Sequence, residues 1–470
     1  MATLTSRRSD GALYIDGMFR AAAGGSIAPV FDKATGREIG TYAVGGVADV
    51  DAAVTAARAA QPAWADLTAD ARGALLRRVA ELYAERSDEW EDLIIRETGG
   101  VRAKARGEIG AARGKLYASA ALAAGPNGQT LPGARPGKTA IIRYAPLGVV
   151  AVITPWNFPI VLGFRAIAPA LALGNTVVLK PASLTPMCGG QWIVDLFNEA
   201  GAPPGVINLV TGSGAEVGEP LAAHPDVSLI HFTGSTEVGR RMALIAAQGL
   251  KRVELELGGD NALVILEDAD VDAAAACGAW AAFEFQGQTC ITAGRHIVMR
   301  AVHDRYLESV RERASRIVVG HPGTDGVDLG PLISDEQLTK VDRIVQESIR
   351  MGARLVTGGT HEGRFYRPTV LDGVTPDMPA FTEEIFGPIL PIITVDTEAE
   401  ALDLVNAQRN LVSAVYTGDL MRGYAFAERV HAGLVHVNDA MGRPTGEDDL
   451  RTFTEAQWIG LQRTPVQYPY

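Results

Sequence analysis

Residues 148–159, with the sequence GVVAVITPWNFP, decide the fold class of this chain. The first half is a run of β-branched residues bounded by turn-forming residues, which is typical of a buried strand. Comparable runs alternate with helical patterns farther along the chain, at 176–180, 206–210, 228–232, 252–256 and 262–266. Because strand, helix, strand repetition builds a parallel sheet covered on both faces, the sequence predicts a doubly wound α/β unit.

The segments on either side of this series define the rest of the fold. Upstream, apolar residues at helical spacing predict amphipathic helices over 51–64 and 68–86. Residues 125–137 are rich in Gly and Pro and 138–144 have an extended pattern, so a projecting hairpin is expected there. After Asp270 the alternation resumes and predicts a second α/β domain. Its expected elements are a helix to Gln286, a strand at 296–300, and helices at 304–317 and 334–351.

The composition is that of an ordinary globular protein. The 470 residues are 47% hydrophobic and 21% charged, which excludes a generally disordered chain. The net charge of −12 repels nucleic-acid phosphates and anionic lipid headgroups, so neither nucleic acid nor a membrane is an expected partner. The 3 cysteines are too few for a disulfide framework and fit a reducing compartment.

No targeting or membrane-spanning segment is predicted. Arg7 and Arg8 form a twin-arginine pair, but the apolar run of an export signal does not follow them. The longest apolar stretch, 148–172, is interrupted by prolines and by Arg165, whereas a membrane helix needs about 20 apolar residues. A cytoplasmic protein is therefore expected.

Three side chains stand out as candidates for covalent chemistry. Cys290 ends the string QGQTC just past a predicted helix, although most intracellular cysteines are buried small hydrophobes. Glu256 ends a predicted strand, and Asn157 follows another between two prolines that fix the backbone. A thiolate, a carboxylate base and an amide donor together are the parts of acyl chemistry.

A candidate phosphate cradle lies in the string GSTEVG at 234–239, where a strand passes into a helix. Backbone amides near Gly234 and the Ser235 hydroxyl suit a pyrophosphate there, and the alternative is a helix N-cap on Ser235 or Thr236. The 8 histidines are scattered and no C-x-x-C occurs, so no metal site is predicted.

Six strings, in order along the chain, resemble the signature set of the NAD(P)-dependent aldehyde dehydrogenases: TPWNFP, GNTVVLKPAS, FTGSTEVG, ELGG, QGQTC and EEIFGP. The resemblance runs from about Val47 to Val437. It implies an aldehyde-dehydrogenase-like α/β fold with two doubly wound parallel-sheet domains and a small oligomerisation hairpin, assembled as a homodimer or homotetramer. The implied divisions are an NAD(P)-binding domain at 1–127 and 147–258, a catalytic domain at 259–440, and oligomerisation segments at 128–146 and 447–470.

The same resemblance assigns roles to single residues. Cys290 is implied as the nucleophile, Asn157 as an oxyanion donor together with the Cys290 amide, and Glu256 as the base that activates water. Lys180 and Glu384 are implied to hold cofactor ribose hydroxyls and Ser235 the pyrophosphate. Trp156, Gln337 and Phe386 line the implied cofactor site. The residues leave two alternatives open: a solvated strand end for Lys180, and a local capping box with Ser334 for Gln337.

Two departures from the family pattern affect the expectations. Ser183 stands where the family often has a Glu that favours NAD over NADP, so either cofactor is expected. After Met441 the chain passes to Gly442 without a loop containing P-F-G-G and S-G-x-G, about fifteen to twenty residues that suit a site-covering loop. Either the protein has lost that loop, which puts substrate enclosure and activity in doubt, or the loop is disordered and absent from this sequence.

The substrate is expected to be an aromatic aldehyde. The strings at 173–180, 286–296 and 454–459 resemble bacterial benzaldehyde dehydrogenases most. Four apolar side chains near the cysteine either add a pocket wall or belong to the core, namely Trp280, Phe283, Phe285 and Ile291.

Two rival functions are considered. A CoA-acylating semialdehyde dehydrogenase has no need of a general base at Glu256, so the presence of that residue argues against it. A non-catalytic relative has no need to keep Cys290, Asn157 and Glu256 together.

Overall fold

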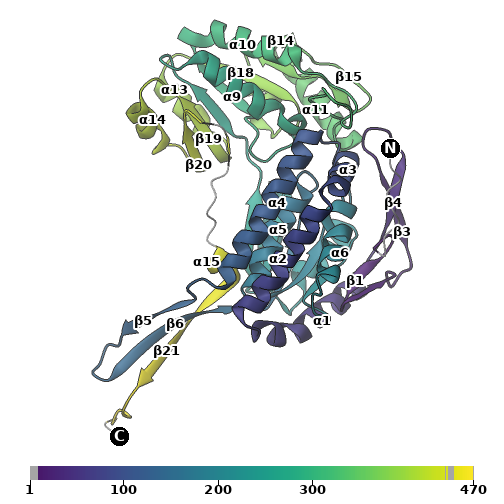
Figure 1. Cartoon of the computed structure of the whole chain (residues 1–470). Helices are drawn as coiled ribbons and strands as arrows, with labels where there is room; N and C mark the ends of the chain where they lie inside the picture. Colours follow the sequence, from purple (N-terminus) through teal and green to yellow (C-terminus); the bar gives the residue numbers. More distant parts are fainter. Residues whose placement is uncertain (1–8, 440, 443–448, 469–470) are drawn as a thin grey trace.

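The computed structural model describes residues 9–439, 441–442 and 449–468. Two α/β bodies lie one above the other in Figure 1, and an arm of antiparallel strands projects away from them. Each body is built on a seven-stranded sheet. The predicted fold class is therefore confirmed, with edge strands that the sequence did not reveal.

The first sheet has the order β11-β10-β7-β8-β9-β1-β2. The five consecutive strands from β11 to β9 are parallel to one another. The residue before the Thr154 turn, Ile153, pairs with Lys180 on one side and Phe232 on the other, so these strands end at one edge. The strands are β1 (Leu13–Ile15), β2 (Met18–Arg20), β7 (Val149–Ile153), β8 (Thr176–Lys180), β9 (Ile207–Leu209), β10 (Val227–Gly234) and β11 (Arg252–Leu257).

Helices cover both faces of this sheet because its strands bury alternate side chains in two separate cores. Val150 and Val152 face a core shared with α2 to α6, whereas Val149 and Ala151 face a core shared with α1, α7 and α8. Figure 1 shows α2, α4 and α5 side by side in front of the sheet. The helices are α1 (Val47–Ala65), α2 (Ala69–Glu85), α3 (Ser87–Thr98), α4 (Arg102–Ala123), α5 (Pro159–Ala172), α6 (Trp192–Glu199), α7 (Glu219–Ala223) and α8 (Thr236–Gln248), with π-turns at η1 (Met187–Gln191) and η2 (Gly214–Gly218).

The second sheet has the order β14-β17-β18-β13-β12-β19-β20, parallel except for β14. Its strands are β12 (Ala262–Ile265), β13 (Arg295–Met299), β14 (Arg354–Thr357), β17 (Thr369–Asp372), β18 (Ile389–Val395), β19 (Asn410–Tyr416) and β20 (Ala432–Val437). Helices α9 (Val271–Phe283) and α10 (His303–Arg316) cover one face. The other face packs against α11 (Asp335–Arg350), α12 (Pro379–Thr382), α13 (Glu398–Asn406) and α14 (Leu420–Ala427).

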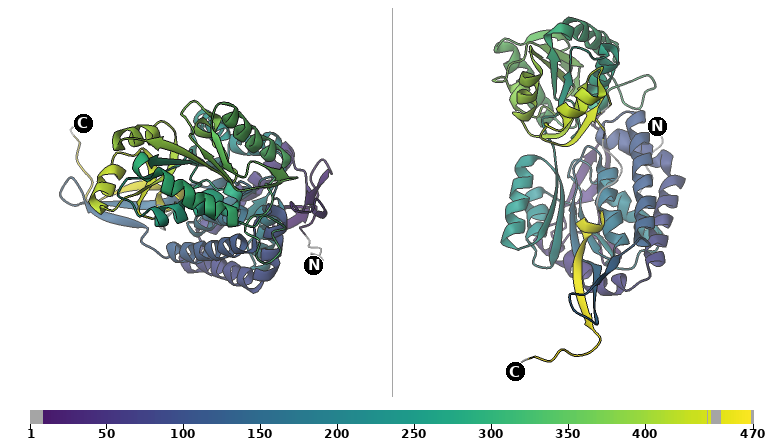
Figure 2. Two further views of the ribbon diagram at one scale, coloured as in Figure 1. Left: turned by 90° about the horizontal axis from the view of Figure 1, so that it is seen from above. Right: turned by 90° about the vertical axis from the view of Figure 1, so that its left-hand side faces the viewer.

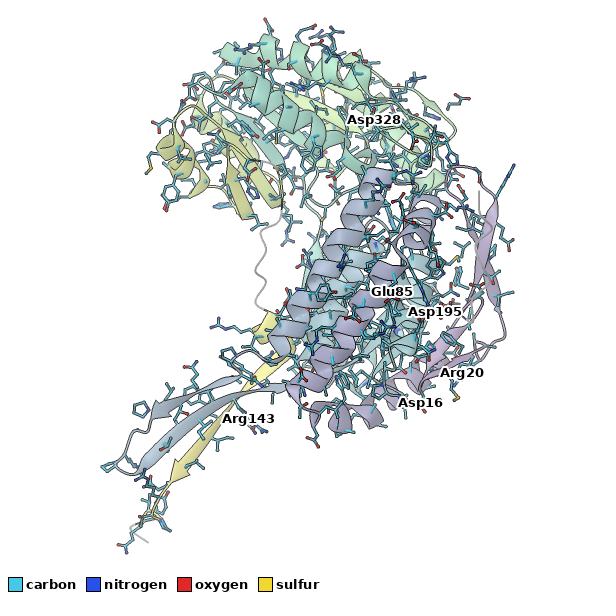
Figure 3. The ribbon with its side chains drawn as sticks, in the orientation of Figure 1. Asp16, Arg20, Glu85, Arg143, Asp195 and Asp328 are labelled. Carbon is cyan, nitrogen blue, oxygen red and sulfur yellow. The ribbon has the colours of Figure 1, made fainter. Side chains whose placement is uncertain are left out.

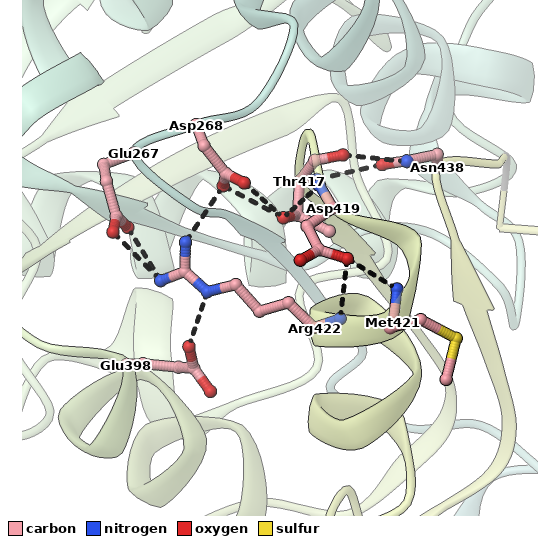
Figure 4. A network of polar contacts seen from close by, with 8 residues as sticks. All are labelled: Glu267, Asp268, Glu398, Thr417, Asp419, Met421, Arg422 and Asn438. Carbon is pink, nitrogen blue, oxygen red and sulfur yellow. Dashed lines mark hydrogen bonds and ion pairs between the residues drawn. The ribbon is translucent and has the colours of Figure 1, made fainter.

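The carboxyl edge of the second sheet is filled by charged side chains. Arg422 of α14 forms ion pairs with Glu267 at 3.0 Å, Asp268 at 3.2 Å and Glu398 at 2.9 Å (Figure 4). Thr417, at the end of β19, donates its hydroxyl to Asp268. This network joins two strand ends to α13 and α14, so the edge where such sheets usually bind ligands holds structural contacts here.

The projecting arm contains the expected hairpin and a third strand (Figures 1 and 2). Strand β6 (Lys138–Pro146) pairs antiparallel with β5 (Gly128–Pro132) and with β21 (Thr454–Gln462). Arg143 of β6 donates to Gln457 of β21 at 2.6 Å, and Figure 3 shows Arg143 on the arm. Strand β21 follows the short helix α15 (Asp449–Phe453), which packs on the first core through Phe453.

Two small hairpins complete the structure: β3 (Ile27–Phe31) with β4 (Glu38–Ala43), and β15 (His361–Glu362) with β16 (Phe365–Tyr366). The predicted domain boundary at 258 and 259 falls between β11 and β12, where the chain leaves the first sheet for the second. The gap in the family pattern after Met441 borders residues 443–448, which are outside the described residues.

One helix prediction is wrong in a way that matters for the site. The helix expected to reach Gln286 ends at Phe283, and a 3₁₀ turn occupies Glu284–Gly287. Phe285 and Gln286 have φ of 48° and 57°, in the left-handed region that non-glycine residues avoid. The chain is therefore turned away from the helical path immediately before Cys290.

Candidate active site

A pocket of about 190 Å³ lies where the carboxyl edge of the first sheet meets the amino edge of the second. Its wall comes from both bodies and includes the three residues proposed for covalent chemistry. The structure therefore brings Cys290, Asn157 and Glu256 together. The lining residues are Pro155, Trp156, Asn157, Leu162, Thr233, Gly234, Ser235, Glu256, Gly258, Cys290, Gln337, Lys340, Glu384 and Phe386.

Asn157 lies in the turn that follows β7, which we call the asparagine loop (residues 154–159). Its side chain is 4% exposed and its orientation is fixed by two hydrogen bonds. Oδ1 accepts the Phe158 amide at 3.0 Å, which leaves Nδ2 to donate to the Gln288 carbonyl at 3.0 Å. The amide nitrogen is thus directed toward the segment that carries Cys290.

Cys290 is half-buried in the segment between α9 and β13, which we call the cysteine loop (residues 284–290). The Cys290 carbonyl accepts Nδ2 of Asn261 at 2.8 Å, and the Asn261 oxygen accepts the amides of Leu411 and Val412. Asn261 is fully buried and fastens the cysteine loop to β19. We did not single out Asn261 from the sequence, although it lies two residues after the ELGG string.

Long-range contacts hold the left-handed part of the cysteine loop. Nε2 of Gln286 donates to the carbonyls of Gly99 at 3.1 Å and Pro331 at 2.8 Å. Gly287 also has a positive φ, and a Cβ there would lie 2.1 Å from the Gly387 carbonyl oxygen. Left-handed non-glycine residues cost on the order of 1–3 kcal/mol each, so this turn persists because its surroundings determine it.

Glu256 is on β11, half-buried, in register with Thr233 of β10, and both side chains line the pocket. The strand end leads to Gly258, where the backbone approaches a second carboxylate. A Cβ at Gly258 would lie 2.1 Å from Oε1 of Glu384, so a larger residue there must displace the carboxylate from its present position. The pocket therefore has two carboxylates, those of Glu256 and Glu384.

Burial raises the pKa of Glu384, while Lys340 and the Gly259 amide oppose the shift. Lys340 lines the pocket one helical turn after Gln337 on α11, and sequence reasoning missed it. Its spacing from Gln337 was the available signal, because residues three apart lie on one face of a helix.

Gln337 joins the segment that carries Phe386 to α11. Ser334 caps the helix by accepting the Gln337 amide, but the Gln337 side chain does not complete a capping box. Its Nε2 donates instead to the carbonyls of Ile385 at 3.2 Å and Phe386 at 2.8 Å. The Phe386 ring meets the Trp156 ring edge-on, with 5.4 Å between centroids, so the contact crosses between the two bodies.

Gly234 and Ser235 lie at the start of α8 and line the pocket. Oγ of Ser235 accepts the Val238 amide at 3.4 Å, which is the helix cap that the sequence allowed as an alternative. A Cβ at Gly234 would lie 2.6 Å from the Phe232 ring. A helix N-terminus therefore faces the pocket, and pyrophosphate binding by Ser235 remains a prediction.

Lys180 and Ser183 do not line this pocket. Lys180 is 5% exposed at the end of β8, where burial lowers its pKa to about 8, so it is not a solvated strand end. Its carbonyl accepts the Thr154 amide at 3.1 Å, which places it beside the asparagine loop. The Ser183 hydroxyl donates to the Gly212 carbonyl at 2.8 Å, a local contact.

The four apolar side chains near the cysteine do not line the pocket either. Phe283 and Phe285 are 2% exposed and belong to the core, while Trp280 is 46% exposed. Leu162 of α5 supplies an apolar wall beside the reactive groups instead.

Across residues 9–439, 441–442 and 449–468, no group of three or more His, Cys, Asp or Glu side chains is arranged to hold a metal ion. Within the same described part of the chain, none of the helices has the length and apolar character needed to cross a membrane.

Comparisons with known proteins agree with this geometry. The model of the aldehyde dehydrogenase family matches residues 19–449. The chain is 41% identical over 465 residues to a benzaldehyde dehydrogenase [NAD(+)] of Pseudomonas putida, covering 95% of each protein. It is 42% identical over 438 residues to a vanillin dehydrogenase of Corynebacterium glutamicum, covering 89% of this chain and 90% of that protein.

Solved structures show the same fold. A crystal structure of an NAD-dependent benzaldehyde dehydrogenase from Corynebacterium glutamicum has a TM-score of 0.92 at 39% identity and covers 98% of both chains. A betaine aldehyde dehydrogenase from Staphylococcus aureus in complex with NAD+ has a TM-score of 0.94 at 28% identity, covering 97% of this chain and 96% of that one. The chain therefore belongs to the aldehyde dehydrogenase family, as an NAD(P)-dependent enzyme.

Proposed function

We propose that this enzyme oxidises an aromatic aldehyde to its carboxylic acid through a thioester on Cys290. One observation carries the proposal: Cys290, Asn157 and Glu256 line a single pocket. The thiol, the amide and the carboxylate come from three segments of the chain that are distant in sequence. The aromatic substrate is supported by the benzaldehyde and vanillin dehydrogenases at about 40% identity.

The first step joins the aldehyde to Cys290. The thiolate attacks the carbonyl carbon, a C–S bond forms, and the carbonyl electrons move onto oxygen. Nδ2 of Asn157 and the Cys290 amide donate to the resulting alkoxide. Donors fixed in place before the reaction stabilise such charge without reorganising, and the two hydrogen bonds that orient Asn157 provide that fixation.

The residues on the other side of the pocket suit a dinucleotide. Glu384 offers a carboxylate to ribose hydroxyls, and Gly258 leaves the backbone bare beside it. Ser235 and the start of α8 suit a pyrophosphate, and Trp156 and Phe386 offer aromatic surface. NAD(P)+ held by these residues would accept the hydride released from the tetrahedral adduct, as the C–H bond breaks and the alkoxide electrons re-form the C=O bond of the thioester.

The last step releases the acid. Glu256 removes a proton from water, the oxygen attacks the thioester carbon, and the C–S bond breaks to return the thiolate. This step needs a base within reach of the thioester, and Glu256 lines the same pocket as Cys290. Transfer to CoA needs no such base, which is why hydrolysis is favoured over the acylating alternative.

Cofactor choice is proposed to be permissive. Ser183 takes the place of an acidic residue and donates to the Gly212 carbonyl, so no carboxylate stands there to repel a 2′-phosphate. Lys180, nearby at the end of β8, supplies a cation for that phosphate. We propose that both NAD+ and NADP+ are accepted.

The enzyme is proposed to act as a homodimer or homotetramer. The arm carries large exposed side chains on β21, with Trp458 66% and Leu461 51% exposed. Exposed apolar side chains on an edge strand are typical of an interface. Light scattering coupled to gel filtration gives the mass, and a monomer at micromolar concentration would rule out this assembly.

The proposed function is tested by following NADH and NADPH absorbance with benzaldehyde and with propanal, each with and without CoA. We expect CoA-independent reduction with both cofactors and kcat/KM for benzaldehyde at least tenfold above that for propanal. Preference for propanal would refute the aromatic assignment, and a strict requirement for CoA would refute hydrolysis. A preference for NAD+ of more than about a thousandfold, roughly 4 kcal/mol, would refute the inference from Ser183.

A further inference from the structure

A buried ion pair behind the pocket contacts both loops that carry the proposed catalytic groups. Lys104 and Glu108 lie one turn apart on α4, with Nζ 2.5 Å from Oε2 and side chains 2% and 0% exposed. A buried pair of this kind contributes little net stability, because the cost of desolvation offsets the attraction. The proposed chemistry does not use either side chain. The position of the Lys104–Glu108 pair therefore points to a role other than stability.

Glu108 holds the asparagine loop. Its Oε1 accepts the amides of Ile160 at 2.8 Å and Val161 at 3.3 Å, in the first turn of α5. The N-cap residue of α5, Phe158, has no side chain able to satisfy those amides, so the cap comes from α4. Ile160 and Val161 come three and four residues after Asn157, just past the asparagine loop, so Glu108 fixes the helix start that follows the loop.

Lys104 holds the cysteine loop against the asparagine loop. Its Nζ lies 4.6 Å from the centroid of the Phe158 ring and 4.5 Å from that of the Phe285 ring. The two rings are 5.5 Å apart and meet at 68°, so one ammonium group is attracted to both. Phe158 follows Asn157, whereas Phe285 is one of the left-handed residues before Cys290.

A glycine allows this close arrangement. A Cβ at Gly100 would lie 2.9 Å from Cδ of Lys104 and 3.0 Å from Cε2 of Phe285. Even an alanine at this position must displace one of the two side chains. The backbone of the α3–α4 connection is thus shaped to admit the contact between lysine and ring.

We propose that Lys104 and Glu108 are positioning residues that hold the asparagine and cysteine loops at the separation that acylation requires. The inference rests on the roles proposed above for Cys290 and Asn157. Neither Lys104 nor Glu108 touches the reacting atoms. Their effect is transmitted through Phe158 and the α5 cap on one side and through Phe285 on the other.

The test compares two reactions of Cys290 that need no cofactor. Acylation by p-nitrophenyl acetate forms a C–S bond, passes through an oxyanion and expels p-nitrophenolate, so it needs both loops. Alkylation by iodoacetamide displaces iodide and needs only the thiolate. In Lys104→Met and in Lys104→Met/Glu108→Gln, we expect the acylation rate to fall tenfold to a hundredfold and the alkylation rate to change less than twofold.

Stability is measured on the same variants by thermal unfolding. Removing one partner leaves a buried charge, whereas the double variant removes both, so its Tm should lie closer to wild type than that of either single variant. If acylation returns to the wild-type rate in the double variant, the pair acts only through stability and the inference fails. Equal losses of acylation and alkylation overturn it as well.

Two further variants complete the design. Gly100→Ala keeps both charges and is expected to slow acylation but not alkylation. It therefore tests the positioning role even if the variants that remove the Lys104 or Glu108 charge do not fold. Lys115→Met removes a partly buried ion pair between α4 and Asp449, and should lower Tm without slowing acylation. Mass spectrometry locates the acetyl group. If wild-type enzyme is not acetylated on Cys290, the proposed function fails; normal acetylation with insensitive variants removes only the positioning inference.

Discussion

The asparagine loop and the cysteine loop face one pocket, yet they are held in place in different ways. Two prolines, Pro155 and Pro159, restrict the asparagine loop from within, and its amide is oriented by an adjacent backbone N–H. The cysteine loop has two left-handed non-glycine residues, and its hydrogen bonds reach carbonyls at Gly99 and Pro331. Both loops have contacts elsewhere in the fold, but the asparagine loop is restricted by its own prolines as well, so the cysteine loop depends more on the rest of the fold.

Removing the reactive atom of each loop should separate their roles most strongly. Cys290→Ala is expected to abolish aldehyde oxidation, because no covalent adduct forms. Asn157→Ala should lower kcat about a hundredfold to a thousandfold, the usual cost of one oxyanion donor. Steady-state assays check both, with Cys188→Ala and Cys277→Ala as matched controls that should remain active. Oxidation by Cys290→Ala would end the proposed mechanism.

Glu256 belongs to neither loop, and its replacement should separate acylation from hydrolysis. Glu256→Gln keeps the shape but removes the base, so steady-state turnover should fall about a hundredfold to ten-thousandfold. Acylation needs only the two loops and the cofactor, so rapid-mixing absorbance should show one burst of reduced cofactor per active site. Wild-type turnover in this variant, or turnover restored by CoA, contradicts the hydrolytic role.

The difference in how the loops are held predicts unequal sensitivity to mutations outside the reactive groups. Gln286→Ala removes both long-range hydrogen bonds of the cysteine loop and should lower kcat about tenfold through misplacement of the thiol. Pro155→Ala leaves the contacts of the asparagine loop intact and should change kcat less than threefold. Comparable losses of kcat in the two variants would mean that the two loops depend equally on contacts with the rest of the fold.

This contrast also explains which parts of the site are readable from sequence. Asn157 is predictable because a proline lies two residues away on each side and the adjacent Phe158 amide binds its oxygen, although its Nδ2 donates to the distant Gln288 carbonyl. The left-handed turn at Phe285 is not, because its partners are 45 or more residues away and no local residue type demands it. Asn261 was missed for the same reason, since its partners Cys290 and Leu411 are distant in sequence. Lys340 was missed although its helical spacing from Gln337 marks it.

The strands of the fold divide in the same way, into those that a local sequence pattern predicts and those that only tertiary pairing creates. Strands with continuous β-branched runs, such as β8 at Thr176–Lys180, are located correctly because burial on both faces leaves a strong pattern. The antiparallel strand β1, which lies between β9 and the edge strand β2, has only three residues, Leu13–Ile15, and pairs with β9 through Tyr14 and Leu209. Such a short strand has no distinctive period, so tertiary pairing alone creates it.

The smallest expected effect concerns the link between the two bodies. Burial raises the pKa of Asp260 to about 7, with Arg295 and Lys340 opposing the shift and Glu384 and Glu383 adding to it. Between pH 4 and pH 7 the unfolded chain ionises this residue before the folded one does. Stability is therefore lost as pH rises through that window, and the loss is complete above pH 7.

Asp260→Asn mimics the protonated form and should remove this dependence. The Tm gain of the variant over wild type is expected to grow from pH 5 to pH 8 by a few degrees. Calorimetry at the two pH values checks it. A gain that is equal at both, or larger at pH 5, would show that the carboxyl is ionised in the folded protein at acidic pH.

Gly258 sets a limit on how this enzyme can be redesigned. The space that a Cβ would need is already occupied by the Glu384 carboxylate. A larger residue at 258 must move that carboxylate, so a library that randomises the ELGG segment to change cofactor use should return glycine at 258 more often than any other residue. Engineering effort is better directed at Ser183, where a substitution replaces the hydroxyl contact to the Gly212 carbonyl.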